Sequence, residues 1–136
     1  MKSISTVRVR YAETDQMGMV YHSNFFVYFE IGRTDFFRES GFTYRMMEQD
    51  NVFMPVVECY CRYLQPAFYD DELCIQTQLE MLSRLRLKFL YQVTRKVDSR
   101  LIAEGYSVHF PTNPKGKPCR IPSKYLSALN SEGAVS

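Results

Sequence analysis

Apolar and polar residues alternate with a period of two over most of the chain beyond residue 55. Between residues 72 and 82, Leu73, Ile75 and Leu79 occupy one set of alternate positions, and mostly polar residues occupy the other. This period is typical of a β-strand with one buried face. Short connections join three consecutive segments of this kind, which predicts an antiparallel meander. The predicted strands cover residues 3–12, 56–67, 72–82, 84–97 and 101–112.

A helical period replaces the alternation in residues 23–40. Phe25, Phe29 and Phe36 fall on one face, residues of N-cap type precede them, and Gly41 follows at the position where a helix usually stops. Such an apolar helix is expected to be largely buried. Gly32 costs about 1 kcal/mol of helix propensity relative to Ala, so we expect the helix to approach a sheet or second backbone closely there. A short helix is predicted over residues 122–129.

The order of elements is one strand, one long helix and then four strands. This order predicts an α+β fold in which a five-stranded antiparallel sheet wraps a long central helix. A single domain is expected over residues 1–130, and residues 131–136 are expected to form a flexible C-terminal tail. The helix is too apolar, and the sheet too small, for a monomer to bury all of the apolar surface, so we expect a homo-oligomer.

Composition narrows the possible functions. The chain has 136 residues and a formal net charge of +2, which is too small to indicate binding to nucleic acid or to a membrane surface. No segment reaches the roughly 20 apolar residues of a membrane span, and the N-terminus lacks an apolar leader, so we expect a cytoplasmic protein. Cys59 and Cys61 are one residue apart, unlike the C-x2-C pairs of zinc sites, and we interpret the four cysteines as buried or half-buried small side chains. We therefore expect no metal.

The polar loop before the helix contains the first candidate site. Asp15 is either a turn or capping residue, or a carboxylate placed to act as base or nucleophile. A helix start near His22 would present free backbone N–H groups that can stabilise an oxyanion. The His22 side chain by itself is more often structural, so its backbone N–H is the stronger candidate.

A second candidate lies in the segment "SRLRLKF". Arg84, Arg86 and Lys88 are two residues apart, so on a strand they would share one face. They form either a solvated edge or a clamp for the phosphates of an extended ligand. Bases in a later loop could add to such a clamp: Lys115, Lys117 and Arg120.

The segment "RYAETDQMGMVYHSNFFVYFEIGRTDFF" resembles the hotdog-fold acyl-CoA thioesterases of the 4-hydroxybenzoyl-CoA thioesterase family. The resemblance extends over almost the whole chain and includes "PVVECYCRYLQPAFYDDEL" and "AEGYSVHF". Its most specific part is the pattern D-x-x-G-x-V-Y-H-x-N-[FY], which runs from Asp15 to Phe25. The resemblance favours the catalytic interpretation of Asp15 over the capping one.

The resemblance implies a hotdog fold that pairs into dimers, or into dimers of dimers that make a homotetramer. It implies hydrolysis of an acyl-CoA substrate with no cofactor, since coenzyme A arrives as part of the substrate. Asp15 would attack the thioester carbon or activate water, and the His22 N–H would polarise the carbonyl. Phosphates of coenzyme A would lie near Arg84, Arg86 and Lys88.

Three alternatives remain open on sequence alone. An acyl carrier protein could replace coenzyme A as the carrier, because the basic residues would also suit an acidic protein surface. A non-catalytic module could bind acyl thioesters without cleaving them, although an intact Asp15 argues against it. A hotdog dehydratase is a weaker rival, since its arrangement of carboxylate and histidine has no match here.

Overall fold

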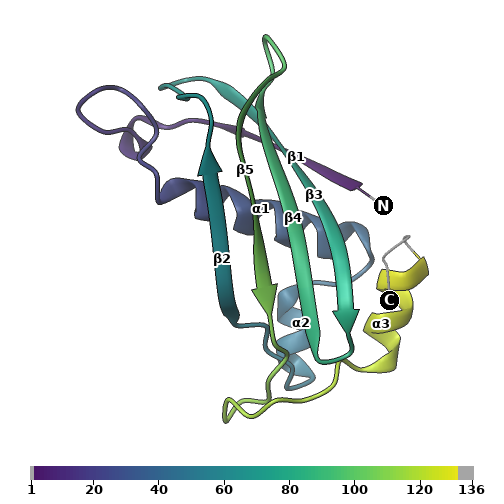
Figure 1. The fold of residues 1–136 in the computed structure, drawn as a ribbon. Helices are drawn as coiled ribbons and strands as arrows, with labels where there is room; N and C mark the ends of the chain where they lie inside the picture. The colour runs from purple at the N-terminus through teal and green to yellow at the C-terminus, as the bar shows by residue number, and fades with distance from the viewer. Residues whose placement is uncertain (1, 132–136) are drawn as a thin grey trace.

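The computed structural model describes residues 2–131 and confirms the expected α+β hotdog arrangement (Figure 1). Five strands form one sheet in the order β1-β3-β4-β5-β2, and each neighbouring pair is antiparallel. The predicted meander is β3, β4 and β5, while β1 and β2 form the two edges. The strands are β1 (Lys2–Arg8), β2 (Val56–Tyr63), β3 (Glu72–Ser83), β4 (Arg86–Arg95) and β5 (Arg100–His109).

The long helix α1 (Asn24–Glu39) lies across the concave face of the sheet, close to the predicted range. Phe25, Phe29 and Phe36 are buried on it, as their spacing predicts. A Cβ added at Gly32 would collide with Oγ1 of Thr77 and lie 3.0 Å from a methyl group of Ile75. The expected close approach of the helix to the sheet is therefore confirmed, and the strand that the helix approaches is β3.

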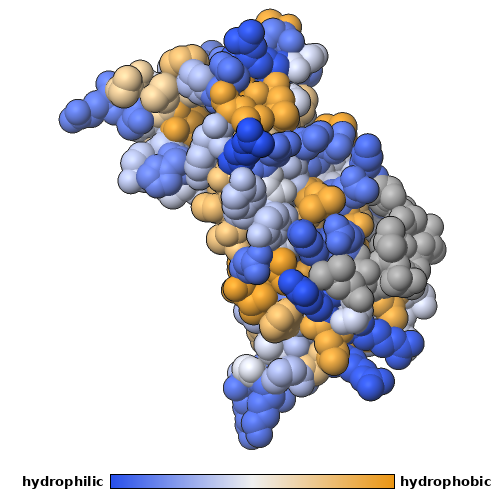
Figure 2. All heavy atoms as spheres, viewed as in Figure 1, coloured by the Kyte–Doolittle hydropathy of each residue, from blue (hydrophilic) through white to orange (hydrophobic). Residues whose placement is uncertain are grey.

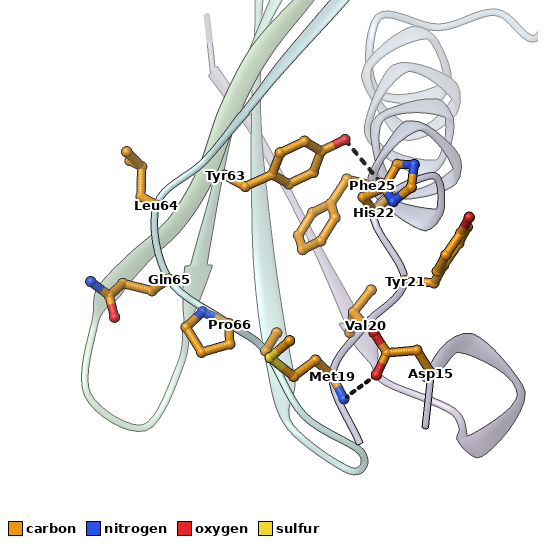
Figure 3. Close-up of a pocket in the computed structure, with 11 residues that line it drawn as sticks. Asp15, Met19, Val20, Tyr21, His22, Phe25, Tyr63, Leu64, Gln65 and Pro66 are labelled. Carbon is orange, nitrogen blue, oxygen red and sulfur yellow. Dashed lines mark hydrogen bonds between the residues drawn. The ribbon is translucent and has the colours of Figure 1, made fainter. Parts of the chain in front are cut away.

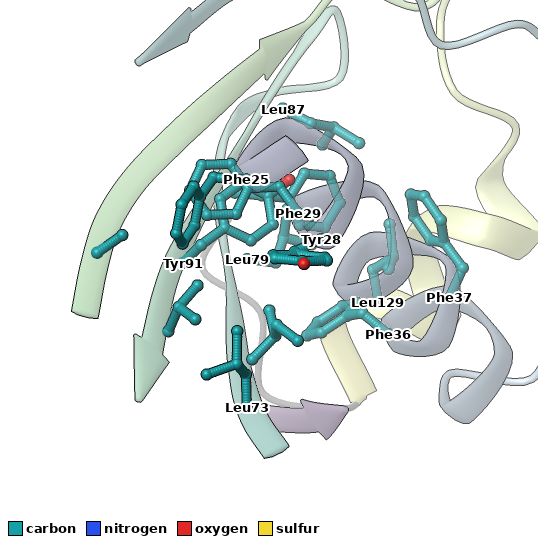
Figure 4. Packing of buried hydrophobic residues seen from close by; sticks show 14 of the residues in the cluster. Phe25, Tyr28, Phe29, Phe36, Phe37, Leu73, Leu79, Leu87, Tyr91 and Leu129 are labelled. Carbon is teal, nitrogen blue, oxygen red and sulfur yellow. The ribbon is translucent and has the colours of Figure 1, made fainter. Parts of the chain in front are cut away.

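The core fills the space between α1 and the sheet (Figure 4). On β4, Leu87, Phe89 and Tyr91 alternate inward and are buried. The ring of Tyr91 stacks on Phe29 with 4.3 Å between centroids and 6° between planes. Aromatic pairs of this kind add about 0.5–1.5 kcal/mol beyond the area they bury. Aromatic side chains thus join the helix to the sheet.

Two short helices lie at the end of α1. The helix α2 (Tyr44–Gln49) was not predicted, and α3 (Ser123–Ser131) extends the predicted 122–129 helix. Asp50, after α2, accepts a hydrogen bond from Tyr125 and lies 2.7 Å from the ammonium of Lys124. The predicted flexible tail, residues 131–136, lies outside the described residues except for Ser131, the last residue of α3.

Four of the predicted strands are shorter than expected, and the fifth strand, predicted to reach residue 112, ends at His109. The first ends at Arg8 because a 3-10 turn follows at Tyr11–Glu13. The second ends at Tyr63, before Pro66. The fourth begins only at Arg86, since Arg84 and Leu85 form the hairpin turn.

The edge strand β2 differs from the others because nearly all of its side chains are exposed. Val56, Val57, Tyr60 and Tyr63 each expose 45–47% of their surface. On the face of the molecule seen in Figure 2, apolar side chains lie among polar ones over the sheet. An exposed apolar edge strand is a ready site for pairing with another chain.

Candidate active site

A tight loop between β1 and α1 holds the carboxylate of Asp15. Its Oδ1 accepts hydrogen bonds from the backbone N–H groups of Met17 at 2.9 Å and Met19 at 3.2 Å. Gly18 supplies the φ of 76° that this turn requires, in the left-handed region that glycine adopts without steric cost. No hydrogen bond formed among residues 2–131 uses Oδ2 of Asp15. One carboxylate oxygen is therefore fixed, and the other is available to a bound molecule.

Glu13 anchors this loop to α1. Glu13 is 8% exposed, and its carboxylate accepts hydrogen bonds from the Tyr28 hydroxyl at 3.0 Å and the backbone N–H of Arg10 at 2.9 Å. Its carbonyl accepts from the N–H of Tyr21 at 2.8 Å and from the Asn24 side chain at 2.9 Å. Burial, followed by the hydrogen bond to Glu13, raises the pKa of Tyr28 far above its ordinary value. Glu13 is thus a positioning residue, while Asp15 remains at the cavity.

The start of α1 leaves two backbone donors without partners. The N–H of Asn24 donates to Tyr21 at 3.0 Å and that of Phe25 to His22 at 3.2 Å. Within the described chain, the N–H groups of His22 and Ser23 donate no hydrogen bond. The predicted cap is absent as well, because the Ser23 side chain makes no capping bond. The positive end of the helix dipole is therefore open to an anion or a polarised carbonyl.

Asp15 and His22 line the same cavity, of about 430 Å³ (Figure 3). The loop, the start of α1 and the segment after β2 form its walls. The N–H of Val20 donates to the carbonyl of Ala67 at 2.8 Å, which holds loop and segment together. The Tyr63 hydroxyl reaches the His22 carbonyl at 3.1 Å, as Figure 3 shows. The lining residues are Asp15, Met19, Val20, Tyr21, His22, Phe25, Tyr63, Leu64, Gln65, Pro66 and Ala67.

The three predicted basic residues lie elsewhere in the chain. Arg84 is in the β3–β4 turn, so the prediction that all three share one strand face is wrong for it. Arg86 and Lys88 do share the outer face of β4, where the Lys88 ammonium lies 4.4 Å from the centre of the Tyr106 ring. None of the three lines the cavity, and none is ion-paired with a carboxylate among residues 2–131.

Sequence reasoning missed a buried chain of hydrogen bonds between α1 and the sheet. Arg33 donates to the hydroxyls of Tyr44 at 3.0 Å and Tyr91 at 3.2 Å. Tyr91 bonds to Ser107 at 2.6 Å, and Ser107 bonds to the His109 ring at 2.8 Å. Burial raises the pKa of Tyr91 to about 12, and burial together with the Arg33 cation lowers that of His109 to about 4. The only sequence signal was a charged residue on an apolar helix face.

The cysteines are free, and Cys59 is exposed rather than buried because β2 is an edge strand. No group of three or more His, Cys, Asp or Glu residues in the described part of the chain is arranged to hold a metal ion. Among residues 2–131, no helix combines the length and the apolar character that are needed to cross a membrane.

Comparison with known proteins gives a consistent result. The family described as "Thioesterase-like superfamily" matches residues 9–129. The E. coli protein "Acyl-CoA thioester hydrolase YbgC" is 29% identical over 122 residues, which cover 89% of this chain and 90% of that protein. The crystal structure of hypothetical protein TT1821 from Thermus thermophilus is 39% identical, with a TM-score of 0.89 and coverage of 96% and 97%. The DHNA-CoA thioesterase from Staphylococcus aureus is 30% identical, with a TM-score of 0.86 and coverage of 99% and 97%.

Proposed function

Because the chain belongs to the thioesterase-like superfamily, we propose that it hydrolyses acyl-CoA thioesters in the cavity formed by the Asp15 loop and the start of α1. Asp15 is the nucleophile or the general base, and the backbone N–H of His22 polarises the thioester carbonyl. The reaction consumes one water and releases the free acid and coenzyme A. We place this activity in the cytoplasm.

One observation carries the proposal: a carboxylate with a free oxygen and the backbone N–H of His22, which has no partner among residues 2–131, lie at the same cavity. A carboxylate that adds to the carbonyl carbon, directly or through water, pushes negative charge onto the carbonyl oxygen. Donors already fixed at a helix start can stabilise that charge without reorganising. A thioester is reactive enough that one carboxylate and one such donor suffice.

We propose that the active unit is a homo-oligomer that forms through β2. Its exposed apolar side chains and unpaired backbone groups favour antiparallel pairing with β2 of a second copy. Antiparallel pairing places the Tyr63 end of one strand beside the Val56 end of the other. The dimer, or a dimer of dimers, would then close the cavity from both sides.

The same pairing supports the proposed role of Arg84, Arg86 and Lys88 in binding the phosphates of coenzyme A. Leu87 lies between Arg86 and Lys88 on β4 and is opposite His109 of β5 in the sheet. His109 is in turn opposite Val56, at the start of β2. The bases of one copy therefore lie at the strand end that meets the cavity of the other. Because these cations form no ion pair with a carboxylate of the described chain, they would equally suit the acidic surface of an acyl carrier protein, which we keep as the second candidate carrier.

The test is release of free thiol from a panel of aromatic, short-chain and long-chain acyl-CoAs. Asp15→Asn keeps the shape of the loop, and we expect it to lower kcat by roughly 10²–10⁴-fold, the range for a positioned acid–base group. Asp35→Asn is the matched control, because Asp35 lies on α1 outside the cavity and pairs with Arg38. Near-normal turnover by the Asp15 variant would refute the mechanism.

A second variant separates the His22 backbone from its side chain. His22→Ala keeps the N–H group and removes the exposed imidazole, so its loss of kcat should fall well below the 10²–10⁴-fold expected for an acid–base group. A loss as large as that of Asp15→Asn would assign catalysis to the imidazole. Saturable binding of acyl-CoA with no thiol release by the unaltered protein would instead favour the non-catalytic binding module.

A further inference from the structure

A second cavity, of about 250 Å³, lies between α1 and β2, farther along the helix than the first cavity. Its apolar walls include Phe26 and Phe29 of the helix and Val56 of the strand. On the same two elements, Phe25 of the helix and Tyr63, at the opposite end of β2 from Val56, line the first cavity. Its volume falls below the roughly 300–1,000 Å³ of sites for drug-sized ligands, so it suits a short acyl group.

The cation that lines this second cavity is the guanidinium of Arg33. Arg33 is 9% exposed, and its Nε and Nη1 are held by the hydroxyls of Tyr44 and Tyr91. Its third nitrogen, Nη2, has no hydrogen-bond partner among residues 2–131. Nη2 is also not one of the side-chain atoms of the described chain that are fully buried without a partner, so the cavity that Arg33 lines gives access to it. The guanidinium is thus fixed on one side and open on the other.

No anion within the described chain compensates this cation. No carboxylate of residues 2–131 lies within 4.0 Å of the guanidinium. The tyrosine hydroxyls hydrogen-bond to it but are neutral. Glu30 is the one acid that lines the cavity, and it is exposed, so water screens its charge. Buried charges in proteins are normally paired, because an unpaired one costs several kcal/mol.

We propose that the second cavity binds the far end of the acyl group and that Arg33 pairs there with a carboxylate of the substrate. The substrate class is then an acyl-CoA whose acyl chain ends in a carboxylate, that is, the monothioester of a dicarboxylic acid. This inference rests on the proposed thioesterase function and adds the chemical class of its acyl group. Arg33 is the specificity-determining residue, and it takes no part in bond cleavage.

The fork of a guanidinium favours this ligand. Nη2 and the second hydrogen of Nη1 can donate in parallel to the two oxygens of one carboxylate, which is the strongest common pairing of arginine. A methyl-terminated chain would fill the apolar part of the cavity but leave the cation unpaired. The difference between these two ligands is therefore charge pairing, and apolar burial is nearly equal for both.

The test compares chains of equal length with and without the terminal carboxylate. Adipoyl-CoA and hexanoyl-CoA form one matched pair, and suberoyl-CoA and octanoyl-CoA form another. We expect kcat/KM to favour the carboxylate-terminated member of at least one pair by about 10–100-fold, the range for a hydrogen-bonded charged pair. Arg33→Gln should abolish the preference, and Arg38→Gln, on the exposed face of α1, should leave it unchanged.

Two further variants guard against a folding defect in Arg33→Gln. Tyr44→Phe removes one hydroxyl that orients the guanidinium but keeps the cation, and it should reduce the preference several-fold. Glu30→Gln removes the exposed acid that lines the cavity, whose charge water screens, so it should leave the preference unchanged or raise it. A preference that falls in Glu30→Gln would overturn the charge argument.

Binding distinguishes failure of this inference from failure of the proposed function. Calorimetric titration of the Asp15→Asn protein measures the affinity for each matched pair without turnover. Turnover of both members with no preference in either kcat/KM or affinity would refute the Arg33 proposal and leave the thioesterase intact. Selective binding of the carboxylate-terminated member, with no thiol release by the unaltered protein, would refute the hydrolase and retain the site.

Discussion

Acid should destabilise this protein through His109, whose ring is 1% exposed at the end of the Arg33 hydrogen-bond chain. Its Nε2 meets the Ser107 hydroxyl at 2.8 Å and its Nδ1 meets the Met54 carbonyl at 3.2 Å. Burial, and after it the Arg33 cation, lowers the pKa of His109 from 6.5 to about 4. The ring is therefore neutral in the folded protein at a pH where an unfolded chain would protonate it.

The sign and size of the effect follow from proton binding. Between pH 6.5 and 4 the unfolded chain binds more protons at this residue than the folded one, so the free energy of unfolding falls as the pH is lowered. One pKa unit corresponds to about 1.4 kcal/mol, which gives a full loss of about 3 kcal/mol below pH 4. At pH 5 the loss is already about 2 kcal/mol, a large share of the 5–15 kcal/mol stability of a typical domain.

Urea denaturation of the unaltered protein and of His109→Gln, from pH 7.5 to 4.5, measures this contribution. Glutamine fits the same space and does not titrate, while the other acids and bases are shared by both proteins. We expect the variant to be the less stable at pH 7.5 and the difference to shrink by about 2–3 kcal/mol at pH 4.5. A difference that stays constant over this range would refute the assignment of a buried neutral imidazole.

Other predictions concern the fold and the proposed interfaces. Gly32→Ala should lower the free energy of unfolding by about 1–3 kcal/mol in urea titrations, because its Cβ would collide with Thr77. Glu13→Gln should cost about 1–3 kcal/mol and also lower kcat, because it disturbs the anchor of the Asp15 loop. The double variant Arg86→Gln/Lys88→Gln should raise KM for acyl-CoA with little change in kcat, and this effect should fade in high salt. Val57→Lys should shift the protein toward monomers in sedimentation velocity, since it places a charge on the exposed edge strand.

Elements with a strong period of their own were predictable from sequence. The helix predicted over 23–40 is observed at Asn24–Glu39, and Gly41 follows it with a φ of 103°. Phenylalanines at helical spacing and a terminal glycine are local signals, so they do not depend on the rest of the fold. The meander was predictable for the same reason, since alternation and short connections define it.

Element ends and short elements were less predictable. Arg84 continues the alternation of β4 but lies in the hairpin turn, because the sequence pattern does not mark where two strands separate. The six-residue helix α2 has too few turns to show a period. Its N-terminal cap, in which the Thr43 hydroxyl accepts from the Met46 N–H at 3.2 Å, is visible only in the structure.

The two candidate sites differ in predictability for a physical reason. Asp15 and His22 are seven residues apart on one loop, so a local motif could bring both to one cavity. Arg33, by contrast, donates to tyrosines of α2 and β4, and one of these bonds in turn to Ser107 of β5. A buried cation on a helix does not reveal which distant residues will surround it. Its surroundings are decided by the antiparallel register that sets Tyr91 of β4 and Ser107 of β5 under the helix. The same tertiary pairing places no carboxylate of residues 2–131 beside Arg33, so the feature that supports the proposed substrate class is a product of the fold and has no signature in any single segment.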